Sequence, residues 1–384
     1  MTNTRRYTYD GSAEVEARIE HDQQLIAQEV MAAVVPKHFH ALVLIGGYGR
    51  GEGGYIWHAD EPAPYNDYDY FLVLKDMSRR KARLLQAQLQ TLAHQLSEKV
   101  GVEVDLAVLR SESLHRLPFT LMHAEMQWGH RVIAGDKDVL NDMPIMPFKS
   151  LGLGEFSRLM NNRGALLLLN AQSLALSDSC LSIESRATFF KYLNKAVLAC
   201  GDALLSAQGI YHPSYIEKMQ RIETIAELPV DDFIHLYRGA LEQKFHPAPE
   251  QYNDENLEDW QDRITQCWLN TLKLFEDQRL GKDISDWDNY LLAEIPKGQL
   301  ESSNPVRNMI ITLRDFGINH TLRHPGWSLR YPRERVIAVL PGLLTRSSSG
   351  ASMPVSMTNP LAVEAGEKWS VCVEHYLEAW ARYA

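Results

Sequence analysis

Three short stretches within the first 110 residues decide the fold: IGGYGRGE at residues 45–52, NDYDY at residues 66–70 and VEVDL at residues 102–106. The apolar run at residues 41–45 stops at two glycines, which predicts a buried strand that enters a turn. Residues 70–74 are apolar throughout, so we expect a strand inside a sheet with only its start near solvent.

The alternation of side chains along these strands places the acidic residues on defined faces. Asp67 and Asp69 share one face of their strand, and Tyr68 and Tyr70 lie on the other. Asp105 lies on the more polar face of the third strand. If the second and third strands are neighbours, the three carboxylates converge on one point.

Converging carboxylates repel one another, and at least one would bind a proton unless a cation were present. Mg²⁺ characteristically uses one or two carboxylates together with substrate phosphates. Two such ions, roughly 4 Å apart, activate an attacking oxygen and stabilise a leaving one. A turn without Cβ atoms lets backbone N–H groups reach phosphate oxygens. The pattern therefore predicts chemistry on the phosphates of a nucleotide, with two Mg²⁺ ions, or Mn²⁺ as a substitute.

The same residues resemble the signature of the polymerase-β-like nucleotidyltransferase superfamily, and most closely that of its bacterial minimal and antibiotic-modifying members. The pattern of these enzymes is Gly-Ser, two variable residues, Arg-Gly-Glu, a spacer and then Asp-x-Asp. Here Gly47 stands for the serine, residues 50–52 match directly, and residues 67–69 supply Asp-x-Asp. The resemblance covers roughly the first 110 residues.

The resemblance implies a role for each matched residue. Asp67 and Asp69 would bind both metal ions, Asp105 would bind one of them, and Gly46 and Gly47 would hold the triphosphate. These three aspartates are also the expected catalytic residues.

Two departures from the family pattern lie beside the glycine turn. The spacer before Asp67 is longer than in the family, and residues 53–64 within it are expected to form a surface insertion, either a lid or an acceptor-binding loop. Tyr48 occupies a position where small or basic residues are common. We expect it to alter the shape of the phosphate turn and to belong to the nucleotide-binding set.

Arg50 is a further candidate for nucleotide binding because of its position in the motif. The alternative is that Arg50 pairs with Glu52 or Asp60 and orders the loop.

In related enzymes a lysine of the helical domain contacts the triphosphate, and Lys195 is the candidate here. Lys191, Lys195 and Asp202 are spaced four and seven residues apart, so they share one face of an expected helix. The alternative is that this face is only a solvated charged surface.

The composition limits the class of protein. A chain of 384 residues is long enough for two domains. The net charge of −10 argues against broad nucleic-acid binding, which needs a basic surface. No apolar run reaches the roughly 20 residues that span a bilayer, and the N-terminus lacks the apolar core of a secretion signal. The four cysteines are widely spaced, as is typical of free thiols in a reducing cytoplasm, where we expect the protein.

The order of apolar patterns predicts an α+β fold. A small mixed β-sheet with helices, the catalytic core, is expected over residues 1–150, and a mainly helical domain over residues 151–384, with a subdivision near 296–305. Expected helices cover residues 13–35, 79–100, 155–176, 184–208, 215–226, 231–243, 257–275 and 367–383.

Three further patterns lie in the helical part. One face of the last helix is apolar and is expected to form core or a partner contact; its residues are Trp369, Cys372, Val373, Tyr376, Leu377 and Trp380. His320 and His324 have a spacing seen in zinc sites, but no third ligand is evident and Pro325 ends a helix there. Four arginines form either an anion-binding patch or ordinary surface charges; they are Arg323, Arg330, Arg333 and Arg335.

Taken together, these patterns favour an enzyme that transfers a nucleoside monophosphate from an NTP to an acceptor hydroxyl and releases pyrophosphate. The expected acceptor is a small hydroxylated molecule, such as an aminoglycoside-like compound. One alternative is a toxin-type enzyme that modifies tRNA or a protein, with a protein as a partner. Another is a non-catalytic nucleotide-binding regulatory module, although a pure binding role gives no reason to keep three repelling carboxylates.

Overall fold

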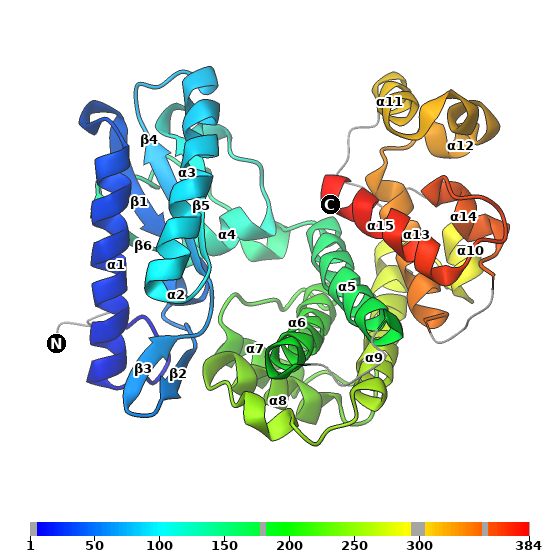
Figure 1. Cartoon of the computed structure of the whole chain (residues 1–384), viewed down its shortest axis with the longest axis horizontal. Helices are drawn as coiled ribbons and strands as arrows, with labels where there is room; N and C mark the ends of the chain where they lie inside the picture. Colours follow the sequence, from blue (N-terminus) through cyan, green and yellow to red (C-terminus); the bar gives the residue numbers. More distant parts are fainter. Residues whose placement is uncertain (1–5, 177–181, 293–303, 348–351, 384) are drawn as a thin grey trace. The chain divides into compact units, whose positions relative to one another are not determined.

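The computed structural model describes residues 6–176, 182–292, 304–347 and 352–383, and it divides into two compact units (Figure 1). Unit 1 contains residues 1–151 and two short later segments, 212–218 and 241–248. Unit 2 contains residues 152–211, 219–240 and 249–384. The fold is α+β, because each strand of the described residues lies in unit 1 and unit 2 is helical.

Unit 1 is built around a mixed four-stranded sheet with the strand order β5-β4-β1-β6. Its strands are β1 (Phe39–Leu44), β4 (Tyr68–Leu74), β5 (Val104–Arg110) and β6 (Arg131–Gly135). β4 and β5 are parallel, whereas β1 is antiparallel to both of its neighbours. β1, β4 and β5 are the three strands that the sequence predicts, and β6 is an addition.

Helices cover both faces of this sheet. α1 (Ala13–Ala33) and α3 (Arg79–Val100) lie side by side on one face, where Ile26, Leu72 and Leu89 are fully or almost fully buried (Figure 1). α4 (Leu121–Trp128) and the segment after β6 cover the other face. α3 is also the crossover that two consecutive parallel strands require.

Local sequence signals explain where the two long helices of unit 1 begin and end. Ser12 and Ser78 are the N-caps of α1 and α3, and their side chains accept hydrogen bonds from the backbone N–H groups of Val15 and Lys81. α3 ends at Gly101, whose φ of 85° is the left-handed conformation that glycine adopts without strain.

The insertion at residues 53–64 is a two-stranded hairpin of β2 (Tyr55–His58) and β3 (Glu61–Pro64), and β3 lies against α1. The shorter elements of unit 1 are α2 (Gly46–Arg50), η1 (Pro36–His38), η2 (Ser111–Arg116) and η3 (Phe148–Ser150).

Unit 2 is centred on three long helices, α5 (Leu153–Leu176), α6 (Ile183–Ala207) and α9 (Leu257–Leu280), which pack against one another. α7 (Tyr215–Ile222) begins in unit 1, and α8 (Phe233–Phe245) ends there. The remaining elements are η4 (Pro249–Tyr252), α10 (Trp287–Leu292), α11 (Pro305–Arg323), α12 (Pro325–Ser328), α13 (Arg333–Thr345), α14 (Val355–Leu361) and α15 (Trp369–Tyr383). The subdivision expected near 296–305 falls mainly on residues 296–303, which lie outside the described residues.

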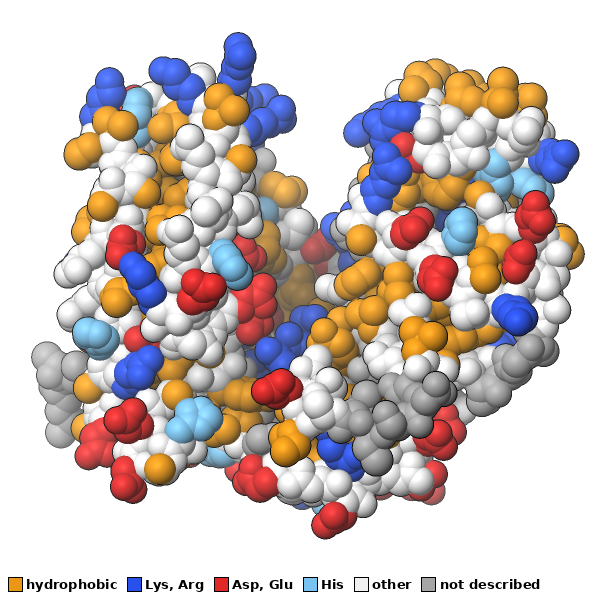
Figure 2. Space-filling model, in the orientation of Figure 1, with side chains coloured by type: hydrophobic (Ala, Val, Ile, Leu, Met, Phe, Trp, Pro, Cys, Tyr) orange, Lys and Arg blue, Asp and Glu red, His pale blue; other side chains and the backbone are white. Residues whose placement is uncertain are grey.

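The sequence predicted that the apolar face of α15 forms either core or a partner contact, and in the structure it is part of the core of unit 2. Trp369, Cys372, Val373 and Tyr376 are buried, and the indole of Trp369 donates a hydrogen bond to the carbonyl of Leu343. In contrast, α11 keeps large apolar side chains exposed, and Figure 2 shows apolar side chains gathered over α11 and α12. No described helix is both long and apolar enough to cross a membrane.

The thiols and the histidine pair of unit 2 have defined surroundings. Cys200, Cys267 and Cys372 are buried free thiols, and Cys180 lies outside the described residues. The rings of His320 and His324 are 4.9 Å apart, but Nε2 of His320 lies 2.7 Å from a guanidinium nitrogen of Arg335. Burial, and after it the charge of Arg335, lower the pKa of His320 to about 4. The group in contact with His320 is thus a cation, which would repel a zinc ion.

The four arginines of unit 2 do not form one surface patch. Arg323 is exposed, Arg330 lies over the ring of Trp327, and Arg335 is only 1% exposed. The hydrogen bonds of Arg335 go to Pro360 and Thr312 inside the unit. The surface interpretation is therefore wrong for Arg335, while Arg333 lines a cavity described below.

Candidate active site

The centre of the candidate site is the pairing of Asp69 with Asp105. The two residues are direct partners in the parallel register of β4 and β5, so their side chains leave the sheet on the same face. That face is the one covered by α4, because Tyr68 and Tyr70 pack into the opposite core. Asp67 precedes the strand by one residue and, by alternation, lies on the side of Asp69. The sheet thus brings together the carboxylates that the sequence predicts.

The glycine turn lies against these carboxylates. The backbone N–H of Ile45 donates to the carbonyl of Asp69 at 2.9 Å, which fixes the start of the turn beside β4. Gly46 then adopts a φ of 66°, and a Cβ atom on it would lie 2.5 Å from Oδ2 of Asp69. Only glycine gives the backbone both this conformation and this close approach.

The electrostatic state of Asp69 reflects its neighbours. Burial is the largest cause that raises its pKa, and the charges of Asp67 and Asp105 raise it further, to about 6. Lys244 and Arg50 act in the opposite direction and lower the pKa of Asp69. The three carboxylates and the two cations are therefore close enough to influence one protonation equilibrium.

This set of donors suits a metal ion that arrives with a nucleotide. Within the part of the chain that the structure describes, no three His, Cys, Asp or Glu side chains form a ready metal-binding group. Mg²⁺ does not need one, since it combines one or two carboxylates with phosphate oxygens. The raised pKa of Asp69 indicates an environment in which a cation would relieve repulsion. Asp67, Asp69 and Asp105 are the residues that would hold the ion.

Tyr48 has a structural role at the base of the insertion. Its side chain is 1% exposed, and its hydroxyl donates to the carbonyl of Gly54. The same hydroxyl accepts hydrogen bonds from the backbone N–H groups of Tyr65 and Asn66. It therefore joins the start and the end of the segment that contains the hairpin. Because the ring is buried, we keep only the backbone of Tyr48 as a candidate for nucleotide binding.

Glu52 connects the glycine motif to residues 212–218 of unit 1. Its buried carboxylate accepts hydrogen bonds from the hydroxyl of Ser214 at 2.6 Å and from the backbone N–H of Tyr215 at 3.1 Å. Arg50 pairs instead with Glu125 of α4 at 3.0 Å. Arg50 thus has a partner in α4 that the sequence did not indicate.

Three cations gather around the ring of Tyr215. The Nζ atoms of Lys218 and Lys244 lie 4.5 Å and 4.7 Å from the ring centroid, and the guanidinium carbon of Arg50 lies 5.9 Å from it. Lys218 is 1% exposed, while Lys244 is partly exposed. These residues form a positive cluster in unit 1, and two of its members act on the pKa of Asp69.

The predicted lysine, Lys195, lies in α6 of unit 2 and is partly buried, as is Lys191. Asp202 on the same face is 5% exposed, so a purely solvated charged surface does not describe this face.

A cavity of about 380 Å³ borders the end of the glycine turn. Its lining includes Gly49 and Gly51, the exposed ring of Trp128, and three arginines, Arg6, Arg50 and Arg131.

Comparison with known proteins adds little to this geometry. No protein-family model matches the chain, and no curated protein matches it either. Among solved structures, the chain is similar to the spectinomycin adenyltransferase AAD(9) from Enterococcus faecialis, solved with ATP and spectinomycin. The identity is 12%, the TM-score is 0.38, and the match covers 66% of this chain and 99% of that chain.

Sequence reasoning missed the cluster around Tyr215. Lys218 follows Tyr215 by three residues at the start of an expected helix, a spacing that places both on one side. Nothing in the pattern signals that this helix start and residues 241–248 return to the first unit. Glu52 was recognised as part of the motif, but its partners, Ser214 and Tyr215, were not.

Proposed function

We propose that the protein is a nucleotidyltransferase that moves a nucleoside monophosphate from an NTP to an acceptor hydroxyl. One observation carries the proposal: the glycine turn and the second and third predicted strands meet, with Gly46 in contact with Asp69 and Asp69 paired with Asp105. These elements span some 60 residues of sequence. The resemblance to polymerase-β-like enzymes requires that the glycine turn and the carboxylates of both strands lie next to one another.

The reaction forms a bond between the acceptor oxygen and the α-phosphorus and breaks the bond from that phosphorus to the bridging oxygen of the β-phosphate. Pyrophosphate leaves in line with the attacking oxygen, and Asp105 accepts the proton of the hydroxyl. When bound at Asp67, Asp69 and Asp105, Mg²⁺ would supply charge neutralisation at the phosphates. Most of the rate enhancement would come from positioning and electrostatic stabilisation.

The chain's own groups account for binding of the leaving group. The backbone of Gly46 and Gly47 would donate to the phosphates, because a residue without Cβ allows their approach. Lys218 and Lys244 would complement the charge that develops on pyrophosphate. We retain Lys195 of unit 2 as a further candidate for the triphosphate.

The first experiment is calorimetric binding of ATP, GTP, CTP and UTP, with and without Mg²⁺. We expect Mg²⁺-dependent binding by the wild type that is lost in Asp67→Ala/Asp69→Ala and retained in a control that removes two exposed acids, Asp60→Ala/Asp142→Ala. The bound nucleotide, labelled on its α-phosphate, then serves in a screen of hydroxylated small molecules. Wild-type binding by the Asp67→Ala/Asp69→Ala variant would refute the site, and binding without transfer to any acceptor would favour the regulatory module.

One observation favours the toxin-type alternative, in which tRNA is the acceptor. The cavity at the end of the glycine turn combines three arginines with an exposed tryptophan, a combination that suits phosphates and a stacked base. Transfer of label to tRNA, weakened by Arg6→Gln and Arg131→Gln, would identify this activity. Transfer to a small molecule that both variants retain would exclude a role for the cavity.

A further inference from the structure

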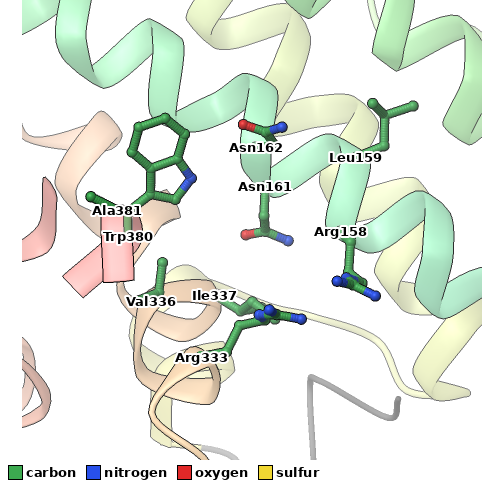
Figure 3. Close-up of a pocket in the computed structure, with 9 residues that line it drawn as sticks. All are labelled: Arg158, Leu159, Asn161, Asn162, Arg333, Val336, Ile337, Trp380 and Ala381. Carbon is green, nitrogen blue, oxygen red and sulfur yellow. The ribbon is translucent and has the colours of Figure 1, made fainter. Parts of the chain in front are cut away.

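Unit 2 contains a cavity of about 400 Å³ that lies between α5, α13 and α15 (Figure 3). Its lining consists of residues 158, 159, 161 and 162 of α5, residues 333, 336 and 337 of α13, and residues 380 and 381 of α15. A volume of this size lies within the range of sites that bind small molecules.

The charged groups of the cavity are two arginines. Arg158 lies on α5 and Arg333 at the start of α13, and Figure 3 shows their guanidinium groups on the same side of the cavity. Arg333 is oriented by a hydrogen bond from its Nε to the carbonyl of Tyr383, and Arg158 pairs with Glu155 at 3.3 Å. None of the described lining residues is acidic. The lining residues therefore carry a net positive charge, which Glu155 offsets in part at Arg158, and planar guanidinium groups bind carboxylate or phosphate oxygens in pairs.

Asn161 is a buried polar residue in the same wall. It is 6% exposed, and its Nδ2 donates to the carbonyl of Ser157 at 2.8 Å. Within the described part of the chain, its Oδ1 is buried and has no hydrogen-bond partner. Leaving such a buried acceptor unpaired is unfavourable, because it has lost its hydrogen bonds to water. A ligand that donates a hydrogen bond at this point would recover that cost.

The other end of the cavity is aromatic and apolar. Trp380 lies across from the arginines, with Asn161 between them in the view of Figure 3, and Val336 also lines the cavity, whereas Ile337 lies beside Arg333. The indole Nε1 of Trp380 is also buried without a partner among the described residues. This end thus offers a flat surface, one hydrogen-bond donor and one acceptor, which a polar heteroaromatic ring can use together.

We propose that this cavity is a second small-molecule site, which binds an anionic heterocycle with its ring at Trp380 and Asn161 and its anionic group at Arg158 and Arg333. The anionic group is a phosphate, as in a nucleoside monophosphate, or a carboxylate on the ring. The site belongs entirely to unit 2 and does not depend on the proposed transfer reaction.

The test is calorimetry on the full chain carrying Asp67→Ala/Asp69→Ala, in EDTA, so that binding at the proposed active site does not contribute. The phosphate probes are AMP and UMP, with adenosine and uridine as uncharged counterparts. The carboxylate probe is orotate, with uracil as its counterpart. We expect one anionic probe to bind with a Kd of about 1 mM or lower, and its uncharged counterpart to bind at least about tenfold more weakly. Binding of AMP or UMP would identify the anionic group as a phosphate, and binding of orotate would identify it as a carboxylate.

Two arginine variants and a control locate the site. Arg158→Gln and Arg333→Gln are each expected to weaken binding about tenfold, whereas Arg307→Gln, an exposed arginine of α11, is expected to leave it unchanged. Ala381→Trp places a bulky ring at the exposed rim and is expected to abolish binding while both arginines remain. Circular dichroism and thermal melting confirm that each variant is folded.

Absence of binding by all anionic probes up to about 10 mM would overturn the proposal. Binding that both the arginine variants and Ala381→Trp retain would overturn it as well, since the probe would then occupy another place. If an arginine variant fails to fold, the result for Ala381→Trp decides.

Discussion

Gly46 and Asp69 are in such close contact that no side chain fits between them: a Cβ atom on Gly46 would lie 2.5 Å from Oδ2 of the carboxylate. The backbone of a residue from the turn after β1 thus shares one wall of the site with a residue of β4. Two changes at Gly46 follow from the addition of a methyl group, namely backbone strain and displacement of the carboxylate.

We expect Gly46→Ala to destabilise the protein by about 1–2 kcal/mol, because an L-residue is strained at a φ of 66°. We also expect the loss of Mg²⁺-dependent NTP binding, because the methyl group displaces the Asp69 carboxylate. Urea unfolding and calorimetry measure the two effects. The matched control is Gly101→Ala. Gly101 has a φ of 85°, and no atom lies within 4 Å of the added Cβ, so this variant has a similar backbone strain but leaves the site unchanged. Equal NTP binding by both variants would contradict the assigned contact.

Asp69→Asn tests the electrostatic repulsion in the absence of metal. The pKa of Asp69 is raised from its ordinary value of 3.8 to about 6, so the native state binds more protons than the unfolded state between these values. The free energy of unfolding therefore falls as pH rises through this window. Because asparagine stays neutral, we expect the variant to be more stable than the wild type by roughly 1–3 kcal/mol at pH 8, and equally stable below about pH 4. Urea titrations at several pH values measure this, with the exposed Asp60→Asn as the control; lower stability of Asp69→Asn at pH 8 would be the contrary result.

Lys244→Met removes one of the cations that lower the pKa of Asp69. Its loss raises that pKa, so ionisation of the carboxylate requires a higher pH. We expect the pH midpoint of Mg²⁺-dependent NTP binding to move upward by up to about one unit, and the affinity at pH 8 to fall as well. Calorimetry across pH 5–8 gives both quantities. The exposed Lys137→Met should move neither, and an unshifted midpoint in Lys244→Met would count against a position of Lys244 beside the carboxylates.

Tyr48→Phe tests the connection between the turn and the hairpin. The phenol makes hydrogen bonds with the backbone of Gly54, Tyr65 and Asn66. Its removal takes the partner from the N–H of Asn66, while the N–H of Tyr65 and the carbonyl of Gly54 keep only the bond between them. We expect a loss of about 1–3 kcal/mol in the free energy of unfolding. Tyr376→Phe is the matched control, because its buried hydroxyl has no partner among the described residues and its removal should be neutral or stabilising. Similar losses in both variants would show that burial of the ring, rather than these hydrogen bonds, is what matters.

Local sequence patterns were sufficient to predict the parts of unit 1 that depend on periodicity. Alternating and continuous apolar runs predicted β1, β4 and β5, and helical spacing predicted α1 and α3. The close approach of Gly46 to Asp69 was not among these predictions.

Pairings between distant parts of the chain could not be predicted in this way. β6 is short and of mixed character, and its identity as a strand depends on pairing with β1. Lys218 and Lys244 belong to segments whose local pattern is helical, and only their return to unit 1 makes them neighbours of Arg50. Lys195 lies in unit 2, as expected of a lysine of the helical domain, and its contact with the triphosphate stays a prediction.

The return of residues 212–218 and 241–248 to unit 1 has a consequence for inheritance. A gene fragment that ends at Leu151 encodes the carboxylates but neither of the two lysines, and it leaves Glu52 without Ser214 and Tyr215. The two units are interleaved along the chain, so no single crossover in the gene can separate them. Recombination that exchanges the helical unit for another must therefore also supply both short segments to unit 1.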